Sequence, residues 1–478
     1  MGTPSVYPTG TTIYNPEKAW SGYTLMPVSG IGAILIDMNG NVIKVWKDFQ
    51  GFPNKLLKGG YCMGSLGRRD AEYAYQDMAD LTEVDWDGNV VWSFNKTEFC
   101  KDGNKEYWLA RQHHDYQREG NPVGYYVPGM ECQTHSGNTL LLCHEDLYNK
   151  RISDKRLLDD CFIEVDWEGN IVWKWNINEH FRELDFSEQE KAILFRNPNY
   201  HTNGEGQCDW MHINSMSVLG PNKWYDQGDE RFHPDNIIWD ARESNIMGIT
   251  DKKTGKIVWQ IGPDFTKTKE LRKIRQIIGQ HHCHMIPKGL PGEGNILIFD
   301  NGGWAGYGYP GRTSKDGTKA DLRDHSRILE IDPVTLKLVW EFTSASWYSM
   351  SSIVAKSQFY SPLISSAQRL PNGNTLITEG CGCRLLEVTP DKEVVWEFIA
   401  PFEMDSPRIY RAYRYPYDYV PQVPAPTEVP VERLNNLSFR VPGAADAHID
   451  NVVSIEGTWG YEGKMDACVT DDQFEDTF

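Results

Sequence analysis

Several features that would place this chain in a specialised class are missing. Its 478 residues contain no run rich in Lys and Arg, and 48 basic against 67 acidic side chains leave a formal net charge of −19. Such a charge repels nucleic-acid backbones and anionic membrane surfaces. The apolar stretches, such as Ile31–Ile36, are far shorter than the roughly 18 residues that a membrane-spanning helix needs. We therefore expect neither a nucleic acid nor a membrane as a partner.

Cysteine motifs and a secretory leader are also missing. The 10 cysteines are scattered without any Cys-x-x-Cys, and Cys381 and Cys383 form the closest pair. Scattered cysteines in a chain of this length are most often reduced core residues, which favours the cytoplasm. Residues 1–21 lack the basic and apolar regions of a signal peptide. We expect a cytoplasmic protein whose oligomeric state, a homo-oligomer included, stays open.

What the chain does contain is a repeat. A phrase of alternating apolar residues, an Asp/Asn/Gly turn and a second short strand recurs six times. The six copies end in Trp46, Trp92, Trp173, Trp259, Trp340 and Trp396. Each copy has the pattern of a β-hairpin, because Gly and Asn tolerate the positive φ of a tight turn. Most copies follow another predicted strand that begins after a Gly-Asn or Pro-Asn turn.

A four-stranded unit repeated six times is typical of a β-propeller, in which radial repetition leaves only short, protected sheet edges. We therefore predict an all-β, six-bladed β-propeller with rim insertions and an irregular C-terminal tail. The alternative of two stacked β-sandwiches does not require a repeated phrase. We assign residues 1–21 to an N-terminal extension, 22–402 to the propeller and 403–478 to a tail that wraps the ring.

Three local features complete this prediction. Helical spacing appears at Glu188–Phe195, with Ser187 as its cap, and again within Thr266–Ile278, so we expect helices there on the rim. The first repeat lacks an inner strand. We expect a strand from the far end of the chain, Asn451–Ile455, to complete that sheet and close the ring.

Polar clusters precede the strands that should line the central channel. Six of the 13 histidines fall at equivalent positions of three consecutive repeats. The clusters are Gln112-His113-His114-Asp115, Asp209-Trp-Met-His212-Ile-Asn214-Ser215 and Gln280-His281-His282-Cys283-His284, and the last repeat carries Gln368 at the same place. Innermost strands of a propeller converge, so these side chains should meet at one point of the channel.

Two kinds of chemistry suit such a cluster. Neutral imidazoles of His113 or His114, His212, and His281 or His282 could bind a transition metal. Alternatively, one imidazole acts as nucleophile or base while the others and Arg242 stabilise an anionic group. Amides such as those of Asn214, Gln280 and Gln368 are poor metal ligands but good hydrogen-bond partners. We therefore favour the second chemistry and expect no metal and no cofactor.

The same residues carry a resemblance. Several motifs together resemble the bacterial PAPS-independent arylsulfate sulfotransferases. They are the histidine–aspartate pair His114-Asp115, the His212-Ile-Asn214 motif, the strand ending in Arg242, Gln280-His281 followed by Phe299-Asp-Asn301-Gly, and Arg411-Ala-Tyr-Arg414-Tyr. The resemblance covers roughly residues 14–419. It implies a six-bladed propeller that moves a sulfuryl group between phenols through a sulfohistidine. The N-terminal β-sandwich and the signal peptide of that family's best-studied type have no counterpart here, and His282 and His284 are additional.

The resemblance also implies roles for single residues. His281 corresponds to the nucleophile, with His282 as the competing candidate, while His114, His212 and Arg242 correspond to its catalytic partners. We expect Asn214, His113, His282, Gln280 and Gln368 to bind a small aromatic substrate. Two other classes remain open: a propeller lyase or hydrolase acting on an aromatic or carbohydrate substrate through a channel histidine, with or without a metal, and a non-catalytic scaffold.

Overall fold

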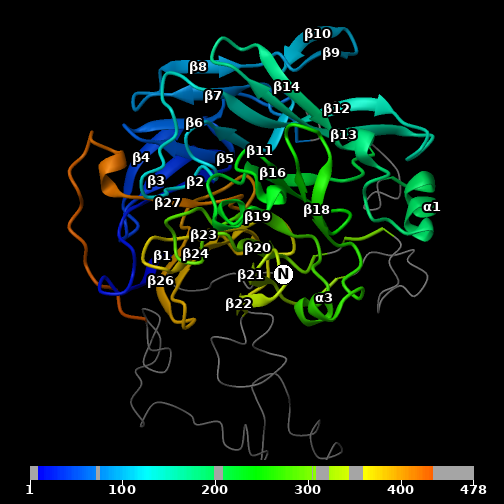
Figure 1. Ribbon diagram of the computed structural model, residues 1–478. Coiled ribbons are helices and arrows are strands. Elements are labelled where there is room, and N and C mark those ends of the chain that lie inside the picture. The colour runs from blue at the N-terminus through cyan, green and yellow to red at the C-terminus, as the bar shows by residue number, and fades with distance from the viewer. Residues whose placement is uncertain are drawn as a thin grey trace, which may run out of the picture. The chain divides into compact units, whose positions relative to one another are not determined.

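The computed structural model describes residues 9–70, 76–198, 208–303, 305–307, 322–343 and 359–433. Nearly all of them belong to one compact unit, Met1–Val431, and only Glu432 and Arg433 of the second unit, Glu432–Phe478, are described. Within the first unit six antiparallel sheets follow one another around a ring (Figure 1). The chain is thus a six-bladed β-propeller, as its repeats predict.

Each blade contains four strands ordered from the axis outward. Blade one holds β27 (Tyr413–Tyr415), β2 (Tyr23–Val28), β3 (Gly32–Ile36) and β4 (Val42–Lys47), and blade two holds β5 (Gln50–Leu57), β6 (Tyr61–Ser65), β7 (Leu81–Val84) and β8 (Val90–Phe94). Blade three holds β11 (Gln112–Arg118), β12 (Thr139–Tyr148), β13 (Arg156–Val165) and β14 (Ile171–Asn176), and blade four holds β15 (Ile213–Val218), β16 (Ile237–Ala241), β17 (Ile246–Thr250) and β18 (Ile257–Ile261). Blade five holds β19 (His281–Met285), β20 (Ile296–Asp300), β21 (Arg327–Ile331) and β22 (Leu338–Phe342), and blade six holds β23 (Ser366–Arg369), β24 (Thr375–Glu379), β25 (Arg384–Val388) and β26 (Val394–Ile399).

The ring is closed by two segments from opposite parts of the chain. The strand β27 completes blade one by pairing Tyr23 with Tyr415 and Leu25 with Tyr413. The expectation that Asn451–Ile455 would do so is therefore wrong, and those residues lie outside the described part. An innermost strand is buried on both faces, as β27 is. Its Arg414 can be buried there because the carboxylate of Glu387 neutralises the guanidinium.

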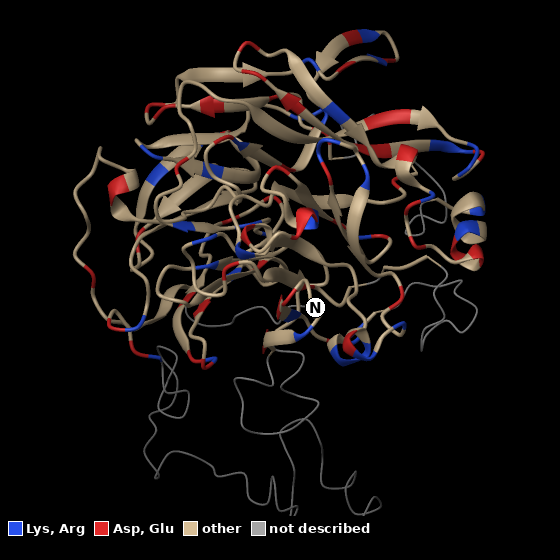
Figure 2. Cartoon of the chain, viewed as in Figure 1, with Lys and Arg blue, Asp and Glu red and all other residues tan. Residues whose placement is uncertain are grey.

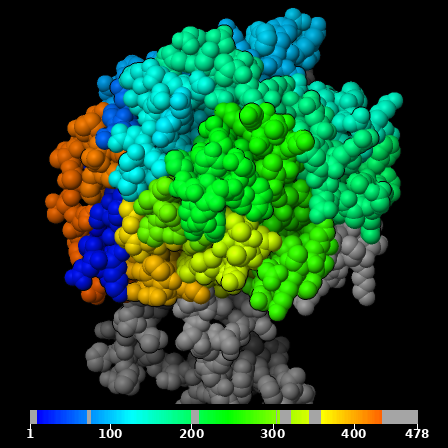
Figure 3. Space-filling view, viewed as in Figure 1, coloured from blue at the N-terminus to red at the C-terminus, as the bar shows by residue number. Residues whose placement is uncertain are grey.

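The N-terminal extension supplies the second closing segment. The strand β1 (Gly10–Tyr14) adds to the outer edge of blade six by pairing with β26. In Figure 3 the blue N-terminal residues accordingly lie beside the yellow and orange ones of blade six. The tryptophan hairpin of blade six is therefore covered by a fifth strand, whereas in the other blades it forms the outer edge.

The six repeated tryptophans join each blade to the next. Every indole N–H donates to a backbone carbonyl in the hairpin turn of the following blade. These bonds run from Trp46 to Asp85 (3.0 Å), Trp92 to Trp167 (2.9 Å), Trp173 to Lys252 (3.2 Å), Trp259 to Pro333 (2.9 Å), Trp340 to Pro390 (2.8 Å) and Trp396 to Met38 (2.8 Å). The last bond returns to blade one, so the series is closed.

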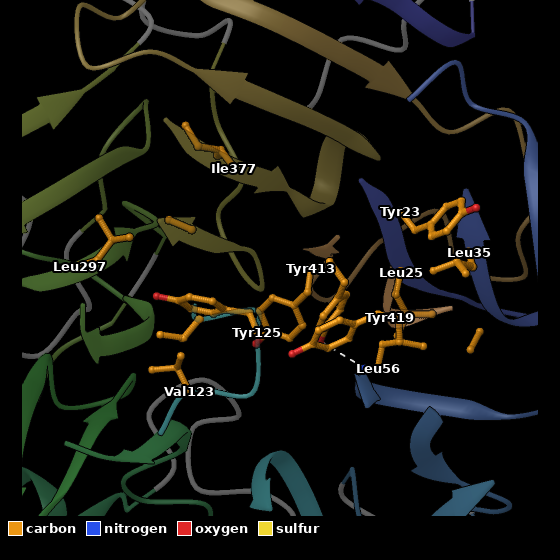
Figure 4. Close-up of a cluster of buried hydrophobic side chains, with 14 of the residues drawn as sticks. Tyr23, Leu25, Leu35, Leu56, Val123, Tyr125, Leu297, Ile377, Tyr413 and Tyr419 are labelled. Carbon is orange, nitrogen blue, oxygen red and sulfur yellow. Dashed lines mark hydrogen bonds between the residues drawn. The ribbon is translucent and has the colours of Figure 1, made fainter. Parts of the chain in front are cut away.

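Apolar side chains fill the spaces between neighbouring blades. Separate buried clusters lie between blades two and three, three and four, four and five, and six and one. A fifth cluster contains Val123, Tyr125 and Val127 from the segment between β11 and β12, together with Tyr413 (Figure 4). The rings of Tyr125 and Tyr413 are 6.0 Å apart, so this segment fills the axis at the end where the inner strands finish.

Helices and short elements lie outside the blades. The predicted helix is α1 (Glu188–Arg196), and Ser187 caps it by accepting a hydrogen bond from the Glu190 N–H. Only α3 (Lys269–Ile274) forms within Thr266–Ile278. The remaining elements are α2 (Lys223–Asp226), the hairpin of β9 (Glu98–Asp102) and β10 (Lys105–Leu109), and the 3-10 turns η1 (Ile177–His180), η2 (Glu230–Phe232), η3 (Gly380–Gly382) and η4 (Tyr417–Tyr419).

The described residues also show the hydrophobicity of the helices, the distribution of charged residues and the state of the cysteines. None of its helices combines the length and hydrophobicity that crossing a membrane requires. Acidic and basic residues are interspersed along the ribbon in the view of Figure 2. The nine cysteines described are free thiols.

Removing one indole N–H should weaken the ring. The Trp259→Phe substitution leaves the buried Pro333 carbonyl without its donor, so we expect the free energy of unfolding to fall by about 1–3 kcal/mol. Denaturant unfolding followed by circular dichroism measures the loss. The control is Trp108→Phe in the β9–β10 hairpin, where the side chain is 48% exposed and the change should stay within about 0.5 kcal/mol. Equal losses in both variants would contradict a joining role for the repeated indole.

Candidate active site

A cavity of about 760 Å³ lies where the inner strands begin. Its wall includes His114, His212, Arg242 and His281, which come from three consecutive blades. These are the four residues to which the sequence analysis assigns catalytic roles. The convergence follows from the ring, because innermost strands of neighbouring blades start at the same end of the axis.

The other five predicted site residues do not line this cavity. The side-chain amides of Gln280 and Gln368 donate to backbone carbonyls of Ala241 and Arg414, respectively, and that of Asn214 donates to the Gln280 carbonyl. The ring of His113 stacks on His144, and Nε2 of His282 lies 3.2 Å from the Tyr413 hydroxyl. In these positions the five side chains hold the inner strands together behind the cavity.

Unusual backbone geometry aims the histidines. His114, His212 and His282 have φ angles of 54°, 53° and 54°, in the left-handed region that non-glycine residues rarely adopt. His114 and His282 lie within irregular stretches of strand pairing. The simple alternation of side chains along a strand therefore fails, and Nδ1 of His113 comes within 2.7 Å of Nδ1 of its neighbour His114. Of the adjacent pair in blade five, His281 lines the cavity.

The tautomer of His281 follows from Asn301. The amide nitrogen of Asn301 donates to the carbonyls of Ser361 and Ile364, both at 2.7 Å, so its oxygen faces His281 as an acceptor. Nδ1 of His281 lies 2.7 Å from that oxygen and 3.1 Å from the Gly279 carbonyl, so it carries the proton. Nε2 therefore keeps its lone pair, to which the Ile364 N–H donates at 3.1 Å.

Burial and the neighbouring Arg242 hold the pKa of His281 well below its ordinary value. Burial and the neighbouring His212 do the same for the pKa of His114. Both rings are thus neutral at pH 7. A neutral imidazole with an unprotonated ring nitrogen is able to act as a nucleophile or a base.

His212 is in the opposite state. Burial disfavours its charged form, but the carboxylate of Asp209, hydrogen-bonded to Nδ1, outweighs burial and raises the pKa of His212. The same contact overcomes burial and lowers the pKa of Asp209. Asp209 thus favours the imidazolium form of His212 next to histidines whose pKa values are lowered, an arrangement that suits proton donation by one ring and nucleophilic attack by another.

Further residues of the cavity were not found by sequence reasoning. The ring of Phe52 lies 4.3 Å from that of Tyr410 and 4.4 Å from that of His114, which creates an aromatic wall. Arg68 and Arg408 also line the cavity and add positive charge. Phe52 and Arg68 stand in blade two, whose inner strand has no histidine cluster, so no local pattern marked them. Asp209, three residues before His212, was the available signal for the carboxylate.

Arg242 carries its own counter-ion. Its guanidinium forms an ion pair with the carboxylate of Glu243, and both residues are almost completely buried. Burial raises the pKa of Glu243, although Arg242 and His212 oppose this. Arg242 and His212, each paired with a carboxylate, still present N–H groups on the wall of the cavity, and such donors suit an anionic ligand.

Five aromatic residues, Trp304, Tyr307, Tyr309, Trp347 and Tyr348, occur between β20 and β23, and the structure describes one of them. Tyr307 is fully buried and its hydroxyl donates to the Pro198 carbonyl at 2.9 Å. Trp304, Tyr309, Trp347 and Tyr348 lie outside the described residues.

The alternative three-histidine metal site does not form among the described residues. One group of three potential ligands meets there, and it consists of His113, His144 and Asp160 behind the cavity. His114, His212 and His281 are not part of that group.

Comparisons with known proteins identify the family of this chain. The family model for arylsulfotransferases (ASST) matches residues 129–396, more than half of the chain. The chain therefore belongs to the arylsulfotransferase family. No curated protein sequence matches it significantly.

Solved structures of similar shape are distant in sequence. A protein of unknown function from Bacteroides caccae is 10% identical, with 82% of this chain and 98% of that chain covered and a TM-score of 0.43. The β-propeller domain of Cps50 (Swd1) from Myceliophteria thermophila is 10% identical, with 84% and 96% covered and a TM-score of 0.35. Virginiamycin B lyase from Staphylococcus aureus is 9% identical, with 84% and 97% covered and a TM-score of 0.33.

The charge of Asp209 should control the protonation of His212. In Asp209→Asn the carboxylate that favours the imidazolium is gone and burial acts alone, so we expect the pKa of His212 to fall below its ordinary value of about 6.5. Titration of the ring followed by NMR of histidine-labelled protein measures the change. The exposed Asp154→Asn serves as the control and should leave the His212 titration where it is. An unchanged titration in Asp209→Asn would show that another group charges His212.

Proposed function

We propose that this protein is an aryl sulfotransferase in which His281 carries the sulfuryl group between an aryl sulfate donor and a phenolic acceptor. The observation that supports this most is the state of His281. Its ring is neutral, its Nδ1 proton is directed to Asn301, and its unprotonated Nε2 accepts the Ile364 N–H. The ring lines a cavity together with Arg242 and His212, whose pKa Asp209 raises. Membership of the arylsulfotransferase family points to the same reaction.

In the first half of the reaction Nε2 of His281 attacks the sulfur of the donor. An N–S bond forms, the bond between sulfur and the aryl oxygen breaks, and its electron pair leaves with the phenolate. Protonated His212 supplies the proton that converts this phenolate to a phenol. Acid assistance of this kind lowers the barrier because the leaving group departs without a full negative charge.

The second half reverses these steps with a new phenol. The acceptor gives its proton back to His212 and its oxygen attacks the sulfur. The N–S bond breaks and its electron pair returns to Nε2, which restores neutral His281. Every proton and electron pair is thereby returned, and the reaction needs no oxidant and no cofactor.

Charge and backbone donors would hold the sulfuryl oxygens. Arg242 and His114 lie on the same wall as His281. The Ile364 N–H, which donates to Nε2 in the structure, loses that acceptor when Nε2 bonds to sulfur and becomes available to a sulfuryl oxygen. Donors fixed before the reaction stabilise developing charge without reorganisation.

The aromatic wall suits the remaining part of the substrate. Phe52 and Tyr410 offer ring faces and edges to a phenyl group, and offset or edge-to-face contacts between rings stabilise such a complex. Arg68 and Arg408 would attract an anionic donor into the cavity at contact range, where the overall negative charge of the chain is largely screened.

The nucleophile is tested with the donor alone. Protein mixed with 4-nitrophenyl sulfate and quenched in alkali should carry one added sulfuryl group on the peptide that contains Gln280–His284. The His281→Ala variant should lose both the adduct and transfer to phenol. Variants His114→Ala, His212→Ala and Arg242→Ala each lose one stabilising contact and should be slower by about 10²–10³-fold.

The matched control is His233→Ala, a half-buried histidine on blade four outside the cavity, which should keep wild-type activity. An adduct that survives in His281→Ala would assign the nucleophile to His282. Aryl sulfate turnover without any adduct would mean direct transfer from donor to acceptor, and no turnover with any aryl sulfate would reject the proposed reaction.

The role of Asn301 gives an independent test. In Asn301→Asp the Nδ1 proton keeps an acceptor, but the new negative charge favours the imidazolium and raises the pKa of His281 by about 1–3 units. A protonated His281 has no lone pair on Nε2, so activity should be lost as the pH falls through this raised pKa. The pH dependence of kcat/KM measures the shift of the acid limb. A lower rate with an unchanged acid limb would indicate that Asn301 only supports the fold.

A further inference from the structure

Behind the cavity, three side chains from adjacent strands of blade three meet at one point. They are His113 on β11, His144 on β12 and Asp160 on β13, and none of them is exposed to solvent. Oδ1 of Asp160 lies 3.3 Å from Nε2 of His113 and 3.8 Å from Nε2 of His144. The three atoms lie within 4.8 Å of one another.

These three atoms lack hydrogen-bond partners among the described residues. The other oxygen of Asp160 accepts the Ile213 N–H at 2.9 Å, so only Oδ1 is left without a donor. A buried polar atom without a partner costs about 1–3 kcal/mol, and such atoms are rare in folded proteins. Three such atoms facing one another indicate that a positively charged group belongs between them.

The hydrogen bonds around the cluster show which ring nitrogen of His144 is unprotonated. Nδ1 of His144 lies 2.6 Å from Oδ1 of Asp77. The other oxygen of this carboxylate, Oδ2, binds Arg69 and Arg111. Burial acts against ionisation of Asp77, but His144 and Arg111 outweigh it and lower its pKa strongly. The carboxylate of Asp77 therefore accepts the Nδ1 proton, and Nε2 of His144 presents a lone pair to Asp160.

The charge around Asp160 is also unbalanced. Three buried aspartates elsewhere in the ring are each met by two cationic side chains: Asp77 by Arg69 and Arg111, Asp115 by Lys55 and Arg411, and Asp300 by Arg323 and Arg327. Asp160 has no Lys or Arg partner within the described residues. The buried Asp159 and Asp240 also have none, but both oxygens of each accept a hydrogen bond, whereas Oδ1 of Asp160 accepts none.

We propose that His113, His144 and Asp160 bind one divalent transition-metal ion, with Zn²⁺ as the ion that this donor set favours. Two imidazole nitrogens and one carboxylate oxygen form a common zinc ligand set, with bonds of about 2.0–2.2 Å. Two ligand atoms on one tetrahedral edge are then about 3.3 Å apart, close to the 3.3 and 3.8 Å separations observed.

The surroundings fit a metal centre in two further respects. Metal-binding histidines usually donate their second ring N–H to a carboxylate or another acceptor, as His144 does to Asp77. In the same way, Nδ1 of His113 lies 2.7 Å from Nδ1 of His114, which is able to accept its proton.

Binding of the ion requires a change in ring orientation. The rings of His113 and His144 are stacked at 3.5 Å with 12° between their planes, so their Nε2 edges must tilt toward each other when the ion binds.

An ion in this position would act on the cavity without touching the substrate. A metal bound to Nε2 of His113 leaves the proton on Nδ1, which then donates to Nδ1 of His114. His114 must in that case carry its own proton on Nε2. The ion would thus select one tautomer of a cavity residue and tie three strands of blade three together.

The test is metal content, which does not depend on the reaction. Full-length protein made without a polyhistidine tag, stripped with chelator and dialysed against Zn²⁺, should retain about one equivalent of zinc by plasma mass spectrometry. Variants Asp160→Asn and His144→Gln should bind at least 10-fold more weakly. The control His233→Gln, at a half-buried histidine that is not part of the cluster, should bind like the wild type. Competition with a chromophoric chelator measures these affinities.

X-ray absorption and anomalous diffraction of the zinc-loaded wild type locate the ion even if the variants fold poorly. A first shell with two nitrogen ligands and an anomalous peak between His113, His144 and Asp160 would support the site. Wild-type protein that takes up no zinc, cobalt, manganese or iron would overturn it and leave a proton on Asp160 as the positive centre. Metal at another position, or retained at full affinity in both variants, would also overturn it.

Discussion

The closed series of indole hydrogen bonds is the interaction on which the molecule depends. Each repeated tryptophan donates from one blade into the hairpin turn of the next, and the bond from Trp396 to Met38 closes the circle. A propeller has no continuous sheet around its ring, so blades are held by side chains packed between them and by bonds of this kind. The angle between successive blades decides where their inner strands meet. The positions of His114, His212 and His281 relative to one another thus depend on contacts at the outer edge.

Neutral and charged histidines coexist in the cavity because each has a different supporting group. An amide oxygen receives the Nδ1 proton of His281 without adding charge, whereas a carboxylate receives that of His212 and stabilises the imidazolium. Asn301 is held in its orientation by two carbonyls, so its oxygen and nitrogen cannot exchange places without losing both bonds. Two residues of one type are in this way assigned two protonation states at a single pH, which is how paired acid and base roles are usually separated.

The sequence predicts the architecture well because a repeat is a global signal. Six copies of one hairpin phrase lead to six blades, and equivalent histidines of consecutive copies do line one cavity. Residues outside the repeats were harder to place. The strand at Tyr413–Tyr415 is short and rich in Tyr and Arg, so its alternation was hidden, and the inner position was assigned to Asn451–Ile455 instead. The left-handed backbone of His114 lies in an irregular stretch of strand pairing, and a simple two-residue period cannot indicate that His113 and His114 touch. Phe52 and Arg68 reach the cavity from a blade without a polar cluster, through contacts that only the folded ring creates.

The completion of blade one by β27 sets an order for events during synthesis. The wall of the cavity includes Arg408 and Tyr410, which directly precede this strand. A nascent chain that has already made all six tryptophan hairpins still exposes the open inner edge of blade one, with the backbone of β2 unpaired on that side. Such an edge is prone to pair with other chains. The cavity and the protected edge therefore form together, once Tyr415 has emerged from the ribosome.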